Sequence, residues 1–139
     1  MLKVGDSWPD FTYGLLTRTD IVRYAGASYD LNPMHYDDEI AQSVGYPSVF
    51  AHGMFSAGLL GSCLSRWLGP ECVRRYTVRF CAIVWPGDVL SAKSRVIRVY
   101  EHANEQRADI ELTMIRQTGE VAVTGAATVS IQNHSGLGT

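Results

Sequence analysis

The chain has 139 residues, with 12 basic and 14 acidic side chains and a formal net charge of −2. This length predicts one domain, spanning residues 1–139, built around one hydrophobic core. Proteins that bind extended nucleic acids usually have a strongly basic surface, so the charge balance argues against that class.

The three cysteines, Cys63, Cys72 and Cys81, form no C-x-x-C pair. They therefore indicate neither a disulfide framework nor a zinc site, and a reducing, cytoplasmic location fits them best. The first residues lack the continuous apolar stretch of a signal peptide. The most apolar segment, residues 49–68, is interrupted by polar side chains, so we expect a buried helix there and no membrane span.

The first predicted elements are short. A strand is expected at residues 10–15. Thr17 and Asp20 then have the spacing of a capping box, which predicts a short helix that begins at Thr17. Asp37 is a second candidate N-cap, for a short helix that ends at Gly45.

A longer helix is predicted from Gly53 to Leu68, followed by Gly69 and Pro70, which favour a helix end. Its apolar residues are distributed almost all round the helix. Such a helix is normally surrounded by protein on every side.

From Arg74 onward the apolar residues alternate with a period of two, which predicts a strand as far as Val84. Further strands are predicted at residues 89–100, 106–117 and 120–131, and we expect residues 132–139 to fray. With the N-terminal strand they form an antiparallel sheet of about five strands. One apolar helix and one sheet must cover each other, so we predict an α+β fold with the sheet wrapped around the long helix.

The densest group of polar residues is Asp30-Leu31-Asn32-Pro33-Met34-His35. Pro33 fixes its own φ and restricts the residue before it, which predicts a rigid elbow that aims Asp30 and His35 at one point. An Asp and a His that share one water molecule can add that water to a double bond or remove it. Asp and Asn beside Pro are also common turn formers, so a plain turn is the alternative interpretation.

A second group, Ala51-His52-Gly53, lies at the expected start of the long helix. The unpaired N–H groups of a helix N-terminus would stabilise negative charge on a thioester oxygen, and Gly53 lets a ligand approach the backbone. Alternatively, His52 is a buried imidazole bound to backbone carbonyls and Gly53 only begins the helix. The two groups together favour an active site.

Asp30, His35, Asp37 and His52 could also surround a divalent ion. None of them shows the i, i+4 histidine pair or the cysteine pairs of familiar zinc motifs. We therefore predict no metal and no cofactor.

The segment from Tyr24 to His35, then Ala41, and then His52-Gly53-Met54 resembles the hydratase-2 motif of the MaoC-like (R)-specific enoyl-CoA hydratases. It is particularly similar to the single-domain β subunits of mycobacterial (3R)-hydroxyacyl thioester dehydratases. The resemblance implies a single hot-dog fold that pairs with a second hot dog, as a homodimer or a heterodimer. It implies a (3R)-hydroxyacyl or trans-2-enoyl thioester of CoA or acyl carrier protein as the substrate.

By the same resemblance, Asp30 and His35 are the catalytic dyad that activates water. Asn32 helps to hold this dyad, and the Gly53 N–H contributes to the oxyanion site. Two further side chains are expected in supporting roles: His52 and Ser56.

The sequence departs from the motif at Tyr29, where the family usually has Gly before the Asp. The hydroxyl that some members carry further along the central helix has two nearest candidates, Ser56 and Ser62. Two other functions stay open at this point: a hot-dog thioesterase, and a subunit of a heteromeric dehydratase that is inactive alone.

Overall fold

The computed structural model describes residues 1–131, so the fraying expected at residues 132–139 lies outside the described range. The elements follow in chain order: β1 (Phe11–Tyr13), α1 (Arg18–Ser28), the 3-10 turn η1 (Pro33–His35), α2 (Asp38–Ser43), α3 (Gly53–Leu68), η2 (Pro70–Cys72), β2 (Val73–Phe80), β3 (Leu90–His102), β4 (Glu105–Arg116) and β5 (Val121–Ser130). The strands form one antiparallel sheet in the order β1-β3-β4-β5-β2. The predicted α+β class is confirmed.

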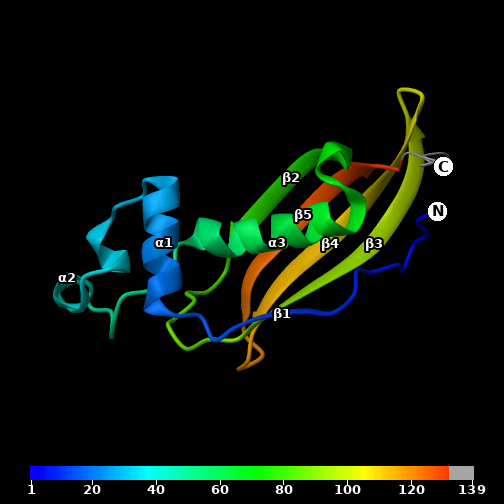
Figure 1. Ribbon diagram of the computed structural model, residues 1–139. Coiled ribbons are helices and arrows are strands. Elements are labelled where there is room, and N and C mark those ends of the chain that lie inside the picture. Colours follow the sequence, from blue (N-terminus) through cyan, green and yellow to red (C-terminus); the bar gives the residue numbers. More distant parts are fainter. Residues whose placement is uncertain (132–139) are drawn as a thin grey trace, which may run out of the picture.

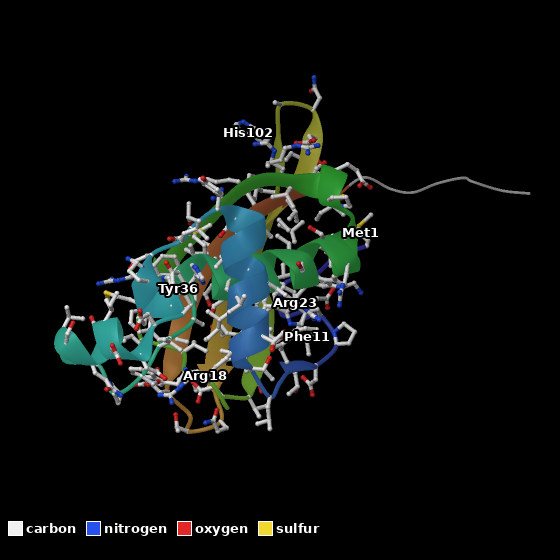
Figure 2. All side chains as sticks on the ribbon, turned by 60° about the vertical axis from the view of Figure 1, so that its left-hand side comes forward. Met1, Phe11, Arg18, Arg23, Tyr36 and His102 are labelled. Carbon is white, nitrogen blue, oxygen red and sulfur yellow. The ribbon has the colours of Figure 1, made fainter. Side chains whose placement is uncertain are left out.

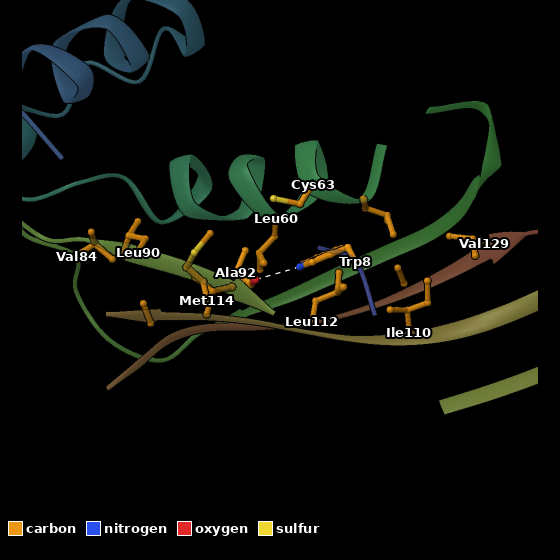
Figure 3. Packing of buried hydrophobic residues seen from close by; sticks show 14 of the residues in the cluster. Trp8, Leu60, Cys63, Val84, Leu90, Ala92, Ile110, Leu112, Met114 and Val129 are labelled. Atoms are coloured by element: carbon orange, nitrogen blue, oxygen red, sulfur yellow. Dashed lines mark hydrogen bonds between the residues drawn. The ribbon is translucent and has the colours of Figure 1, made fainter. Parts of the chain in front are cut away.

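Helix α3 lies across one face of the curved sheet, and α1 and α2 lie beyond its N-terminal end (Figure 1). The core fills the space between α3 and the sheet, where Leu60 of the helix packs with Leu112 and Met114 of β4 (Figure 3). Trp8 closes one side of this core, and its indole N–H donates to the Ala92 carbonyl at 3.0 Å. This packing of α3 against the sheet determines where the N-terminus of the helix lies.

The predicted caps of the two short helices are confirmed. Thr17 Oγ1 accepts from the Asp20 N–H at 3.1 Å, and Asp20 Oδ2 accepts from the Thr17 N–H at 2.9 Å, which completes the capping box. Asp37 caps α2 by accepting from the N–H of Glu39 at 3.0 Å. These caps fix the direction in which the chain enters and leaves the elbow.

The bounds of α3 agree with the prediction, but the expectation that protein surrounds it is wrong for this chain. Met54, Gly58, Ser62 and Arg66 are exposed. Their spacing of four residues puts them on one face, which the sheet of the same chain does not cover. One long face of the central helix is therefore open.

Strand β2 ends at Phe80, so the predicted extension to Val84 is wrong. Beyond Phe80 the chain leaves the sheet, and the N–H groups of Cys81 and Ala82 both donate to the Ala122 carbonyl, at 2.8 and 3.2 Å. Val84 is still buried in the core, and its carbonyl accepts from the Ala51 N–H at 2.9 Å beside the start of α3. The alternation correctly indicated burial, but the hydrogen bonds of a strand stop earlier.

Asp88 anchors the connection between β2 and β3. Its carboxylate is 3% exposed and accepts from Arg116 Nε at 2.7 Å, Gln117 Nε2 at 2.8 Å and the Trp85 N–H at 2.9 Å. Burial raises the pKa of Asp88, but these donors outweigh it, so the pKa lies below the ordinary value of 3.8. Asp88 therefore links the turn at residues 85–88 to the end of β4.

Among the described residues, no helix has both the length and the apolar character needed to cross a membrane. The free thiols are Cys63, Cys72 and Cys81, of which only Cys81 is exposed.

Candidate active site

The segment from Tyr29 to Tyr36, which we call the elbow, is held by hydrogen bonds within itself. Asn32 caps η1, because its Oδ1 accepts from the Met34 N–H at 3.1 Å and its carbonyl accepts from the His35 N–H at 3.1 Å. The Asn32 N–H in turn donates to Asp30 Oδ1 at 3.3 Å. Asn32 therefore connects the two residues predicted to act together.

His35 is 9% exposed, and its Nδ1 lies 2.6 Å from the Phe50 carbonyl. A carbonyl only accepts, so Nδ1 carries the proton and Nε2 keeps its lone pair. The Phe50 ring also lies edge-on to the imidazole, at a centroid distance of 5.1 Å. The chain just before α3 thus presents His35 as a base through Nε2.

His52, the residue before α3, is 2% exposed and stacks on His35, with 3.7 Å between ring centroids. Its Nε2 donates to the Asp30 carbonyl at 3.1 Å, so the expectation of a buried imidazole bound to a backbone carbonyl fits the geometry. Burial lowers the pKa of His52, and the neighbouring His35 lowers it further, against the opposing effect of Asp30. His52 is therefore a neutral imidazole that connects the elbow to the start of α3.

The side chains of Asp30, His35 and His52 offer atoms that all lie within 4.8 Å of one another. Asp30 Oδ2 lies 3.9 Å from His52 Nε2, and its side chain is 54% exposed. No hydrogen bond is recorded between Asp30 and His35 in the described part of the chain. The elbow therefore places the Asp30 carboxylate and the His35 imidazole close together.

The same three side chains are close enough to hold a metal ion. One nitrogen of each imidazole faces a backbone carbonyl, at 2.6 Å for His35 and 3.1 Å for His52, which leaves the other nitrogen of each ring as a possible ligand. The absence of a metal stays a prediction, with a direct test. We expect incubation with EDTA, followed by its removal, to leave activity unchanged, and activity lost to EDTA and restored by Zn²⁺ would contradict it.

Gly53 begins α3, and the preceding His52 makes no side-chain cap, so its side chain leaves the first-turn N–H groups uncapped. A Cβ at Gly53 would lie 2.9 Å from the Phe80 ring, so only glycine fits without displacing that ring. The sequence did not indicate this role for Phe80, because it predicted that the strand continues to Val84. The Phe80 ring thus lies directly against Gly53 at the N-terminus of α3.

Ser56 lies one turn further into α3 and is 1% exposed. Its Oγ and His52 Nδ1 are buried without hydrogen-bond partners among the described residues. Ser62, the other candidate hydroxyl, is exposed on the open face of α3. Of the two candidate hydroxyls, Ser56 is therefore the one that presents an unsatisfied polar atom near Gly53.

A cavity of about 290 Å³ opens beside these residues. Its walls come from the start of α3, including His52, Gly53 and Ser56, and from residues 80–84 and Val123 on the sheet side. The cavity therefore lies at the start of α3, and His52 connects it to the elbow that carries Asp30 and His35.

The MaoC like domain family matches residues 9–118 of the chain. The chain belongs to the MaoC-like family. A relative from Rhodospirillum rubrum, an (R)-specific enoyl-CoA hydratase, is 31% identical over 118 residues, which is 84% of this chain and 80% of the relative. A 3-hydroxyacyl-thioester dehydratase X from Mycobacterium tuberculosis is 42% identical over 66 residues, 47% of this chain and 22% of that one. Membership makes this MaoC-like chain a hydro-lyase of the hydratase/dehydratase type.

Solved structures show the same fold as this MaoC-like chain. An (R)-hydratase from A. caviae involved in PHA biosynthesis has a TM-score of 0.82 at 25% identity, with 94% of this chain and 98% of that chain covered. The ChsH1-ChsH2 complex from M. tuberculosis gives a TM-score of 0.83 at 21% identity, with 95% of this chain and 100% of that chain covered. The predicted hot-dog fold is confirmed.

Tyr29 has a φ of 60° at the C-cap of α1, and 83% of it is exposed. This left-handed conformation suits glycine, which explains why the motif usually has Gly here. We expect Tyr29→Gly to stabilise the fold by about 0.5–1 kcal/mol, since relief of the backbone strain exceeds the added chain entropy. Urea denaturation measures this change.

Tyr29→Ala is the matched control, because it removes the ring but keeps the Cβ that causes the strain. An equal gain in both variants would show that the ring, and not the backbone, is responsible.

Proposed function

We propose that this protein hydrates trans-2-enoyl thioesters to (3R)-hydroxyacyl thioesters and catalyses the reverse dehydration. The observation that carries the proposal is the convergence of Asp30 and His35 on His52, the residue that begins the cavity wall at the uncapped start of α3. Named relatives that catalyse this type of reaction support it. The carrier is CoA or acyl carrier protein.

In hydration, the Asp30 and His35 pair binds one water molecule between the carboxylate and Nε2. The pair takes a proton from this water as its oxygen bonds to C3, and delivers a proton to C2. Asn32 keeps the spacing of the pair through its hydrogen bonds to the elbow. The reverse sequence releases water from the 3-hydroxyacyl thioester.

Negative charge collects on the thioester oxygen while C2 is a carbanion equivalent. The Gly53 N–H, at the positive end of the α3 dipole, is the donor that we propose for this oxygen. Ser56 supports it, since its buried hydroxyl lacks a partner in the described residues and lines the same cavity. His52 supports the geometry by joining the Asp30 carbonyl to the start of α3.

We also propose that the protein works as a dimer with a second hot-dog chain. Strand β2 is an edge strand of eight residues, and α3 leaves one face open beside it. An exposed edge readily pairs with another strand. Light scattering of the purified protein, alone and mixed with candidate hot-dog chains from the same source, distinguishes a homodimer from a heterodimer.

Residues 1–139 are proposed to form one domain, and the three free thiols support a reducing, cytoplasmic environment. The function is tested by following the enoyl absorbance of crotonyl-CoA and by analysing the stereochemistry of the product. We expect the (R)-3-hydroxy product. An (S)-product, or release of free CoA thiol, would replace the proposal with a different hydratase or a thioesterase.

A further inference from the structure

We infer that the edge strand β2 selects a different hot-dog chain over a second copy of itself, and that the selected chain carries Asp or Glu opposite Arg75 and Arg79. The inference rests on the proposed dimer and names the kind of partner that it requires. Among the described residues β2 pairs only with β5, so its other edge leaves backbone N–H and C=O groups for a further strand. The side chains along β2 then decide which strand is added.

The two faces of β2 differ in character. Tyr76 points towards α3, because its hydroxyl donates to the Ala57 carbonyl at 2.6 Å. Since side chains alternate along a strand, Arg75, Thr77 and Arg79 lie on the outer face of the sheet, where all three are exposed. The apolar side of an added strand must also face inward, so its outer side chains lie beside those of β2.

The two arginines on this outer face lack counter-charges from their own chain. Within residues 1–131 neither guanidinium forms an ion pair. The β5 residues opposite Arg75 and Arg79 are Thr128 and Thr124, which are uncharged. The edge strand therefore carries two positive charges that the described part of the chain does not neutralise.

A second copy of β2 brings these charges together. In antiparallel pairing centred on Thr77, Arg75 of each copy lies opposite Arg79 of the other copy. Directly opposite side chains have their Cβ atoms about 5 Å apart, and like charges at this separation are destabilising. Sliding one strand by two residues makes the arginines diagonal neighbours, which long side chains still reach. Electrostatic repulsion therefore opposes self-pairing in each of these registers.

A partner strand with Asp or Glu at the opposite positions turns the same contacts into ion pairs. The planar guanidinium of arginine matches a carboxylate and binds it through two parallel hydrogen bonds. The strand also satisfies the backbone groups at the edge of β2, which an acidic surface without a free strand cannot do. The exposed edge and its two arginines together favour an acidic edge strand as the partner.

Arg75→Glu tests this rule within a single chain. In pairing centred on Thr77, the introduced glutamate of each copy lies opposite Arg79 of the other, so the variant complements itself. Its dimer is expected to be at least about tenfold tighter than that of the unchanged protein, measured by sedimentation equilibrium. Added salt is expected to weaken the dimer of the variant, because it screens the attraction, and to strengthen self-association of the unchanged protein.

The double variant Arg75→Glu/Arg79→Glu represents an acidic partner. Alone it repels its own copy, but mixed with the unchanged protein it is expected to form mixed dimers in excess over both homodimers. Native mass spectrometry separates the three dimers by mass. Lys93→Glu/Arg95→Glu is the matched control with the same change of charge, because both residues are exposed on β3, which β4 and β5 separate from β2. This control is expected to give no excess of mixed dimers.

An unchanged protein that dimerises as tightly as Arg75→Glu, at low and high salt alike, would overturn the inference. So would a mixture of the unchanged protein and the double variant without an excess of mixed dimers, since the arginines would then not select a partner. Hydration of crotonyl-CoA is assayed separately. Its failure would contradict the proposed function, while the choice of partner is decided by the dimer measurements alone.

Discussion

Asp30→Asn and His35→Ala are each expected to lower kcat/KM for crotonyl-CoA hydration by about 10²–10⁴. The Asn side chain keeps the shape of Asp30 but cannot accept a proton from water. The Ala variant removes the Nε2 that the Phe50 carbonyl orients through Nδ1. The double variant is expected to lose little more than either single one, since both residues act on the same water.

Two controls separate this effect from general damage. Glu39→Gln removes a carboxylate on α2, and His102→Ala removes an imidazole at the far end of β3, well away from the elbow (Figure 2). Both residues are exposed, and both controls are expected to retain activity. Circular dichroism and urea denaturation verify that the dyad variants fold. Folded dyad variants with nearly full activity would eliminate Asp30 and His35 as the catalytic pair.

Asp88→Ala is expected to destabilise the fold by about 3–5 kcal/mol, because it leaves the guanidinium of Arg116 poorly compensated in a nearly buried position. The change also removes the acceptor of the Trp85 N–H and of Gln117. The free energy of unfolding, measured in urea at pH 7, checks this value.

Glu120→Gln is the matched control, since Glu120 also pairs with Arg116 at 2.7 Å but its side chain is 53% exposed. Exposed pairs contribute at most about 1 kcal/mol. Equal losses in the two variants would contradict the importance of burial at Asp88.

The same pair predicts a dependence on pH. The pKa of Asp88 in the folded protein is below its ordinary value of 3.8, so its contribution to stability is present above that value. This contribution is lost as the pH falls below 3.8 and through the folded pKa. Asp88→Ala is therefore expected to reduce the loss in the free energy of unfolding as the pH falls below 3.8. Some loss is expected to remain, because the pKa of Glu105 is also lowered, to about 2, chiefly by hydrogen bonds from Arg74.

Local signals in the sequence were sufficient for most of the fold. The capping box at Thr17, the cap at Asp37 and the bounds of α3 depend on residues within a few positions of each other, and the structure agrees with all of them. The end of β2 depends instead on Ala122, which lies far along the chain. Alternating hydrophobicity does not distinguish a strand from an irregular buried segment.

The open face of α3 shows a second limit. Met54 is apolar and 55% exposed. Its hydrophobicity indicates a covered position but does not reveal whether the cover comes from the same chain. Sequence periodicity therefore overstates how much of a helix one chain can bury.

The site was predictable in part. The Pro33 elbow correctly indicated that Asp30 and His35 approach each other, and Ser56 is buried at the cavity. The partner of His35 is a backbone carbonyl, which any residue at position 50 would supply, so no side chain could indicate it. The approach of Phe80 to Gly53 depends on the curvature of the sheet.

The bond from His35 to the Phe50 carbonyl also affects how this site tolerates mutation. Every amino acid carries that carbonyl, so substitutions at position 50 can alter the aromatic packing on His35 while the imidazole tautomer stays the same. The side chain at position 50 can therefore change without changing which nitrogen of His35 carries the proton. A change that moves the main chain at residue 50 away from His35 would remove this preference for the proton on Nδ1.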